Sequence, residues 1–161
     1  MAWRGSTDIK DRIFAAIVYL IPLHYAFEYF GRGLSLQHPT LNPLLNLIAI
    51  ICTPVSLIYS AIPLGLGSIV IFFVLYMAVV RNESINHFIR FNTLQAILID
   101  IALFLLALVG GIIAIGFIGQ IFNTVVFLGT LIACGYGIWQ SAIGRYAEMP
   151  TISEAAYSQL R

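Results

Sequence analysis

Long apolar segments alternate with short polar stretches along almost the whole chain. Four of these segments are long enough for a transmembrane helix, which needs about 20 apolar residues with a range of about 17–25. They cover residues 13–30, 62–80, 94–118 and 121–143. Lipid cannot satisfy free backbone N–H and C=O groups, and the alternating pattern of a barrel strand is missing from the sequence. The pattern therefore predicts an all-α integral membrane fold, with residues 1–161 forming a single membrane domain.

A fifth apolar stretch, residues 44–60, is harder to assign. It contains Asn46 and Pro54 and is followed at once by the span that begins at residue 62. Lys and Arg concentrate in cytoplasmic loops. With four spans, seven of the eight basic residues share the side of the N-terminus, and a fifth crossing would leave three against five. We therefore expect both termini on the cytoplasmic or stromal side and an outer interfacial or re-entrant stretch at residues 44–60.

The most polar run in the interior of the chain covers residues 81–93. Its apolar residues Ile85, Phe88 and Ile89 follow i, i+3, i+4 spacing, which predicts a short amphipathic helix at the inner membrane surface. The polar face is either a docking surface for a partner or substrate, or a connector whose arginines anchor the neighbouring spans at the headgroups. The docking surface would consist of Arg81, Asn82, His87 and Arg90.

Polar side chains also occur within or beside the predicted spans. A carboxylate in hydrocarbon costs about 2.5–3.5 kcal/mol, so Asp100 must be neutralised, paired or facing a polar cavity. Its predicted depth makes Gln140 and Ser141 candidate partners. The polar residues either line a conduit or make interhelical hydrogen bonds, and both interpretations stay open. The set consists of Asn92, Gln95, Asp100, Gln140 and Ser141.

Small residues recur at four-residue spacing in the last two spans, a pattern that lets helix backbones approach closely. The helix-packing positions are Gly129, Ala133 and Gly137, continued by Ser141, together with Ala107 and Gly111. The spacing predicts tight packing, against either another span of this chain or a second protein.

Composition supports the membrane assignment and argues against several functions. The chain is 60% hydrophobic and only 9% charged, whereas soluble domains carry about 25% charged residues. A net charge of +1 without a basic cluster argues against nucleic-acid binding. Cys52 and Cys134 lack the spacing of a disulfide framework or a metal site. We expect no metal and no cofactor, and the sequence does not indicate a bound lipid or pigment.

Catalytic motifs are missing from the sequence as well. Neither HExxH nor a phosphate-binding loop occurs. Ser68 follows two glycines, yet no histidine in a partner span recommends itself as its base. His24, the only histidine within a predicted span, fits a packed, hydrogen-bonded side chain better than a metal or chlorophyll ligand. We therefore expect that the chain is not an enzyme.

The N-terminal residues resemble neither a cleaved signal peptide nor a transit peptide. No small-residue cleavage site follows the apolar run from Ile13, and Asp8 and Asp11 come too early for an acid-poor transit peptide. We expect a protein made in the compartment that it serves, either a bacterium or a plastid.

Three pieces of the sequence together resemble one family. The central stretch VRNESINHFIRFNTLQAILIDI, the start WRGSTDIKDRIFAAIVYLIPL and the tail PTISEAAYSQL are similar to the Tic20 (Ycf60) family of four-span membrane proteins. The resemblance extends over nearly the whole chain and implies a protein-import component of the inner chloroplast envelope, or its cyanobacterial relative. It also implies four helices with both termini on the stromal or cytoplasmic side.

Two functions from different classes follow from this resemblance. The first is a protein-translocation subunit whose partners are other membrane proteins and a polypeptide in transit, in contact with lipid. The second is a non-catalytic accessory or assembly subunit of a larger complex, for example a photosynthetic one. The expected location is a cyanobacterial plasma or thylakoid membrane, or the chloroplast inner envelope or thylakoid for a plastid-encoded protein.

Overall fold

The computed structural model describes residues 8–113 and 116–160, and every regular element in these ranges is helical. Parts of the predicted domain, including two residues of the predicted span 94–118, lie outside the described residues. In chain order the elements are α1 (Ile9–Ile17), α2 (Leu20–Ala26), η1 (Phe27–Gly31), α3 (Leu34–Gln37), η2 (Pro39–Leu41), α4 (Asn42–Ala61), η3 (Pro63–Gly65), α5 (Gly67–Val74), η4 (Leu75–Val80), α6 (His87–Ile113), α7 (Gly116–Ala142) and α8 (Ile152–Gln159).

Four helical stretches are long and apolar enough to cross a membrane, which confirms the predicted four-helix membrane fold in outline. α1, α2 and η1 together form the first of them. η2 with α4 forms the second, α6 the third and α7 the fourth. These stretches are Ile9–Gly31, Pro39–Ala61, His87–Ile112 and Gly116–Ala142.

The second long helix is not where the sequence placed it. Residues 44–60, predicted to be interfacial or re-entrant, lie within the 20-residue helix α4. The predicted span 62–80 is instead broken at its start by the turn η3, where Leu64 and Gly65 have φ angles of 65° and 69°. Only the shorter apolar helix Gly67–Val80 follows. Pro63 has no backbone N–H to donate, and Gly65 permits a positive φ. These two residues together end the preceding helix α4 before the turn.

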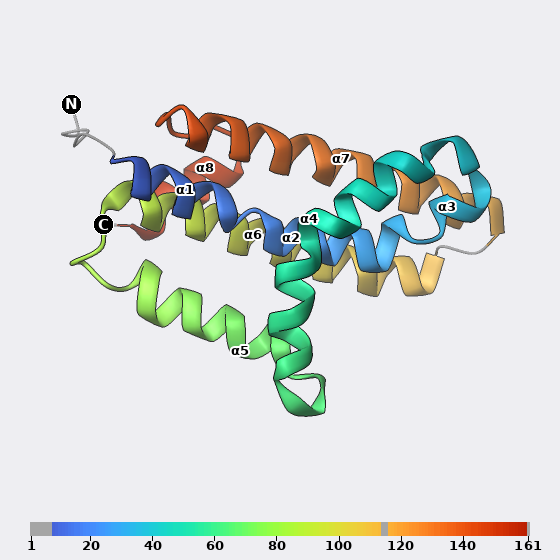
Figure 1. Cartoon of the computed structure of the whole chain (residues 1–161), viewed down its shortest axis with the longest axis horizontal. Helices are drawn as coiled ribbons and strands as arrows, with labels where there is room; N and C mark the ends of the chain where they lie inside the picture. Colours follow the sequence, from blue (N-terminus) through green and yellow to red (C-terminus); the bar gives the residue numbers. More distant parts are fainter. Residues whose placement is uncertain (1–7, 114–115, 161) are drawn as a thin grey trace.

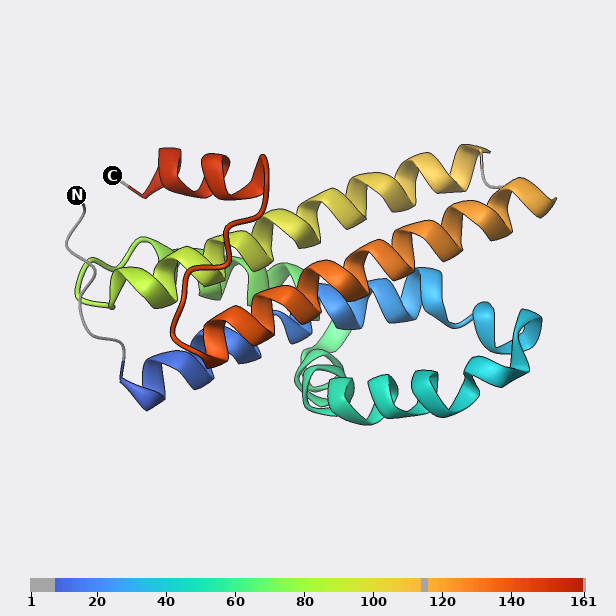
Figure 2. The same ribbon diagram turned by 90° about the horizontal axis from the view of Figure 1, so that it is seen from above.

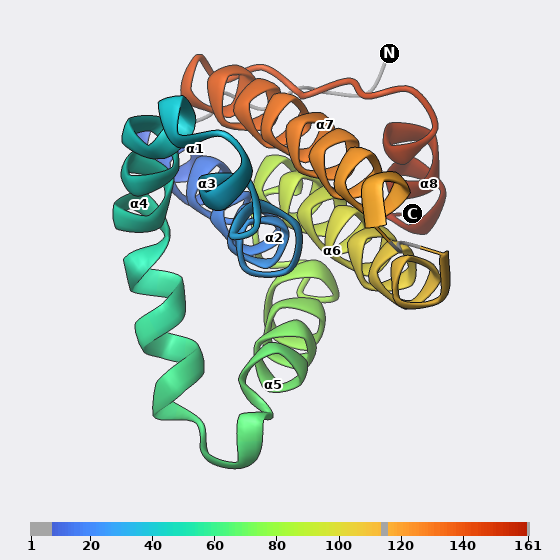
Figure 3. The same ribbon diagram turned by 90° about the vertical axis from the view of Figure 1, so that its right-hand side faces the viewer.

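α4 leaves the bundle before the chain returns through α5. Its ribbon runs along the bundle in its first half and then turns away, and the helix contains Pro54 in its interior (Figure 1). Interior prolines are a usual cause of such bends. The hairpin made of α4, η3 and α5, which we call the α4–α5 hairpin, therefore stands away from α6 and α7 (Figure 3).

The chain ends and the polar linker gather at one end of the bundle. α1 begins there, residues 81–86 connect η4 to α6 there, and α8 lies there, whereas α3 and η2 lie at the opposite end (Figures 1 and 2). The placement of both termini on one side of a membrane, expected from the charge count, stays a prediction. That this end faces the cytoplasm or stroma stays a prediction.

The separate amphipathic helix predicted at residues 81–93 does not form. Residues 81–86 are irregular, and α6 begins at His87 and continues without interruption through the predicted third span. Asn86 caps this helix, because its Oδ1 accepts a hydrogen bond from the backbone N–H of Phe88 at 3.0 Å. Phe88 is fully buried and packs edge-on against Tyr146, so it faces protein instead of membrane.

The core lies where the N-terminal helices meet the last two spans. α1 packs against α6 and α7, and α2 packs against α4, α6 and α7. A second, smaller apolar cluster joins the start of α6 to α8 through Phe91, Leu94 and Ala156. The larger cluster extends along the bundle, and its members include Tyr19, Leu34 and Phe127.

Candidate functional site

Tyr19 lies at the centre of a buried polar network between α1, α6 and α7. It sits at the junction of α1 and α2, where Pro22 has no backbone N–H to donate to Val18. The side chain of Tyr19 is fully buried. A Cβ atom on Gly137 of α7 would lie only 2.5 Å from its Cε1 atom, so the glycine provides the space that the ring fills.

The hydroxyl group of Tyr19 reaches two amide side chains of α6. It lies 2.9 Å from Oδ1 of Asn92 and 2.8 Å from Oε1 of Gln95, and its one proton is donated to either oxygen. Ser141 of α7 donates to the same Asn92 oxygen at 3.0 Å. Asn92 and Gln95 are both fully buried, and buried polar groups of this kind stabilise a core only when they are paired.

The C-terminal segment closes this network. Nε2 of Gln95 donates to the backbone carbonyl of Ala147 at 2.8 Å and to Oγ of Ser153 at 2.7 Å. The backbone N–H of Met149 also donates to Oγ of Ser153. Gln95 therefore fastens the connection between α7 and α8 onto the bundle.

The structure brings together three of the five polar residues singled out in the sequence. Asn92, Gln95 and Ser141 make interhelical contacts with one another or with shared partners. Asp100 and Gln140 stand apart, each with one buried oxygen that has no hydrogen-bond partner among the described residues. The pairing of Asp100 with Ser141 suggested by the sequence does not form, because Ser141 donates to Asn92.

Two members of the network, Tyr19 and Ser153, were missed by the sequence reasoning. A tyrosine three residues before a proline inside an apolar span was the available signal for Tyr19. Ser153 gave no such signal, because its role depends on the fold of the C-terminal segment back onto α6.

The predicted small-residue positions play different roles. Gly137 contacts Tyr19, and Ala133 and Ala107 are partly buried against the core. In contrast, nothing lies within 4 Å of a Cβ atom built on Gly129 or Gly111. Gly110, next to Gly111, makes the close approach instead, because a Cβ there would lie 2.8 Å from Cε1 of Phe122.

The residues predicted to form an inner docking surface divide into two pairs. Arg81 and Asn82 are exposed, and Asn82 caps its own turn by accepting a hydrogen bond from the backbone N–H of Ser84. Nδ1 of His87 lies 3.1 Å from the hydroxyl of Tyr146. Nε of Arg90 donates to the carbonyl of Val80 at 2.8 Å, which ties the end of η4 to α6. Docking at Arg81 and Asn82 stays a prediction.

A hollow of about 210 Å³ opens between α2, η1 and the α4–α5 hairpin. We call it the hairpin hollow; its lining residues are His24, Tyr25, Glu28, Tyr29, Tyr59, Gly65, Gly67 and Ser68. Most of the side chains in this lining carry polar groups. Polar groups from α2, η1, α4 and α5 therefore reach the hollow.

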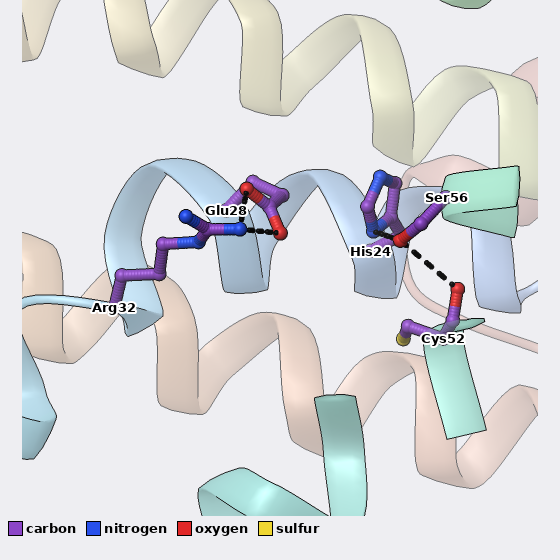
Figure 4. Close-up of polar contacts among 5 residues, drawn as sticks. All are labelled: His24, Glu28, Arg32, Cys52 and Ser56. Atoms are coloured by element: carbon purple, nitrogen blue, oxygen red, sulfur yellow. Dashed lines mark hydrogen bonds and ion pairs between the residues drawn. The ribbon is translucent and has the colours of Figure 1, made fainter. Parts of the chain in front are cut away.

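The polar side chains around the hairpin hollow are held by local contacts (Figure 4). Nδ1 of His24 lies 3.4 Å from Oγ of Ser56 on α4, and its ring packs edge-on against Tyr59. His24 is thus a packed, hydrogen-bonded residue, as the sequence favoured. Glu28 and Arg32 form an ion pair at 2.7 Å, one turn apart (Figure 4).

Comparison with known proteins gives a consistent match over the whole chain. A family model described as "Chloroplast import apparatus Tic20-like" matches residues 8–156. A Tic20 family protein of Synechocystis sp. is 48% identical over 170 residues, covering 100% of this chain and 99% of the relative. The Arabidopsis thaliana protein TIC 20-II, chloroplastic, is 31% identical, covering 96% of this chain and 74% of the relative. The Tic20 family protein Ycf60 of Porphyra purpurea is also 31% identical, covering 97% and 78%. The chain belongs to the Tic20 family.

Proposed function

We propose that this chain is a non-catalytic subunit of a membrane complex that moves polypeptides across or into a membrane. The observation that carries the proposal is the family match over residues 8–156, whose model is described by chloroplast import. Relatives from Synechocystis and from chloroplasts align with nearly the whole chain. Four helices that are long and apolar enough to cross a membrane support a role in a membrane.

The buried network is not itself the lining of a route. A polypeptide inside a membrane exposes backbone N–H and C=O groups that lipid cannot satisfy, so its route must offer polar partners or water. In this chain Asn92 and Gln95 are fully buried and bonded within the core, so they are not free to serve a passing chain. The route therefore lies outside the core of a single chain and needs further subunits to enclose it.

A stalled precursor tests this proposal. A precursor that carries a tightly folded domain at its trailing end is expressed with the tagged chain, and the membranes are solubilised in mild detergent. We expect the precursor to co-purify with the chain and to be lost when its targeting segment is disrupted. Equal recovery of both precursors, or of neither, would contradict the proposal.

The alternative role is that of an assembly subunit. The buried polar network favours it, because its side chains bond to one another within the chain. In that case the chain co-purifies with stable membrane partners in fixed proportion, and recovery of those partners does not change when the precursor is stalled. The same purification separates the two roles, because only a translocation subunit retains the precursor.

A further inference from the structure

Asp100 is a carboxyl group at mid-depth that nothing in its own helix explains. It is the fourteenth of the 27 residues of α6, so about 20 Å of helix extends on either side of it. Its Oδ1 is shielded from the exterior and has no hydrogen-bond partner among the described residues. Ionisable groups at such depth are costly and normally pair with another group.

No lysine or arginine in the described part of the chain lies at this depth. Arg90, the nearest basic residue on the same helix, precedes Asp100 by about 15 Å of helical rise and is bonded to the carbonyl of Val80. The other described basic residues lie at the ends of the apolar helices: Lys10, Arg12, Arg32, Arg81 and Arg145. A second copy of this chain would carry its described basic residues at the same ends, so it could not supply the missing cation either.

Within this chain Asp100 can be reached by one water molecule at most, and lipid offers it no hydrogen-bond donor. Asp100 lines a cavity of about 10 Å³ between α2, α5 and α6, which is room for a single water molecule. Apart from Asp100 and Ser68, the lining is apolar, with Ile21, Phe72 and Ile97 among its members. Lipid acyl chains at this depth offer no hydrogen-bond donor.

The cavity adjoins the hairpin hollow, because Ser68 lines both. The α4–α5 hairpin also has exposed apolar side chains: Leu57 is 64% exposed and Leu64 is 89% exposed. Figure 3 shows this hairpin standing away from α6 and α7. The exposed apolar side chains of the hairpin, together with the unpaired oxygen of Asp100 in the cavity that Ser68 also lines, fit a helix that is apolar except for one basic side chain.

We propose that a transmembrane helix of a different subunit packs against the α4–α5 hairpin and places a lysine or arginine at Asp100. This inference rests on the proposed function, because it names the chemistry of one partner in the translocation complex. A resident helix is chosen over a polypeptide in transit because it would pair the buried oxygen of Asp100 whether or not a polypeptide is moving.

The test begins with purification of the tagged chain in mild detergent and measurement of each integral membrane partner. Asp100→Asn keeps the shape of the side chain and removes its charge. The matched control is Thr93→Val on the same helix, since Oγ1 of Thr93 is also buried and has no hydrogen-bond partner within residues 8–113 and 116–160. We expect Asp100→Asn to lower recovery of one partner by about tenfold, since intramembrane polar contacts are worth about 1–2 kcal/mol. Thr93→Val should leave recovery unchanged.

Two further measurements identify the contact. A photo-crosslinking residue in place of Ser68 should capture the same partner. The captured site should lie in an apolar span of that partner, within about one helical turn of a lysine or arginine. Asp100→Lys combined with Asp at that partner position should restore recovery. The thermal stability of the isolated chain should be unchanged or higher in Asp100→Asn, because the variant removes an unpaired carboxyl group.

Several results would overturn the inference. Full recovery of every partner with Asp100→Asn is one, and a capture site without a nearby basic residue is another. A drop in the stability of the isolated Asp100→Asn chain would give Asp100 a role within its own fold instead. If Asp100→Asn leaves recovery of every partner unchanged, the stalled precursor can still co-purify with the chain. If the precursor does not co-purify, Asp100→Asn can still lower recovery of a membrane partner. The two experiments therefore test the two proposals separately.

Discussion

The ring of Tyr19 fills the space that a side chain on Gly137 would need. A Cβ atom at Gly137 would lie 2.5 Å from Cε1 of Tyr19. Two turns earlier on α7, a Cβ atom at Gly129 would meet nothing within 4 Å. Two glycines of one small-residue pattern therefore differ in what they do, and only Gly137 supports the buried network.

Gly137→Ala should destabilise the protein, whereas Gly129→Ala should not. Tyr19 is fully buried and bonded, so it cannot move aside easily, and overpacking of this kind costs about 1–3 kcal/mol. Gly129→Ala should be neutral or stabilising by up to about 1 kcal/mol, because alanine favours a helix. Denaturant unfolding in detergent micelles measures both. Equal effects of the two substitutions would show that Gly137 and Tyr19 are not in close contact.

Tyr19→Phe should lower stability by about 1–3 kcal/mol, because it removes a hydroxyl that two buried amide oxygens share. Tyr136→Phe is the matched control, since Tyr136 is an exposed tyrosine on α7. The same unfolding measurement compares the two variants. If Tyr19→Phe is as stable as Tyr136→Phe, the hydroxyl does not hold the network together.

Ser153→Ala should loosen the C-terminal segment without unfolding the bundle. The hydroxyl of Ser153 accepts hydrogen bonds from Gln95 and from the backbone of Met149, and alanine removes this acceptor from both, although Gln95 keeps its bond to the carbonyl of Ala147. Amide hydrogen exchange over residues 147–159 should become faster by about tenfold, while exchange in the middle of α7 stays unchanged. Ser158→Ala is the control, because Ser158 is exposed and bonds only within α8. Equal exchange in both variants would mean that Ser153 does not fasten this segment.

Single cysteines should report which ends of the bundle share a side of the membrane. Ser84→Cys and Ser158→Cys should react with an impermeant thiol reagent from the cytoplasmic or stromal side, and Thr40→Cys from the opposite side. The native Cys52 and Cys134 are buried and should stay unreactive. Labelling of all three positions from one side would contradict the four-span arrangement.

The membrane class, the four long helices and the family followed from the sequence, because apolar length and composition determine them directly. The position of the second helix did not. Pro54 argued against a helix at residues 44–60, yet α4 accommodates it in its interior, whereas Pro63 and Gly65 interrupt the expected span. Phe88 was assigned to the membrane face because periodicity gives the apolar side of a helix but not whether lipid or protein covers it.

The candidate site was predictable in part for a similar reason. Asn92, Gln95 and Ser141 are polar residues in or next to an apolar span, and their composition alone marks them. Their partners are distant in sequence, as the contact between Tyr19 and Gln95 shows, so spacing could not identify them. The contribution of Ala147 through its backbone carbonyl leaves no trace in the amino-acid sequence.

If this chain is a translocation subunit, a polypeptide in transit passes directly beside it. The most direct measurement places a photo-crosslinking residue at successive positions of a stalled precursor and identifies the proteins captured within the membrane. We expect adducts with this chain from the precursor positions at membrane depth, and none when the targeting segment is disrupted. Adducts that form only with other membrane proteins at every position would contradict it.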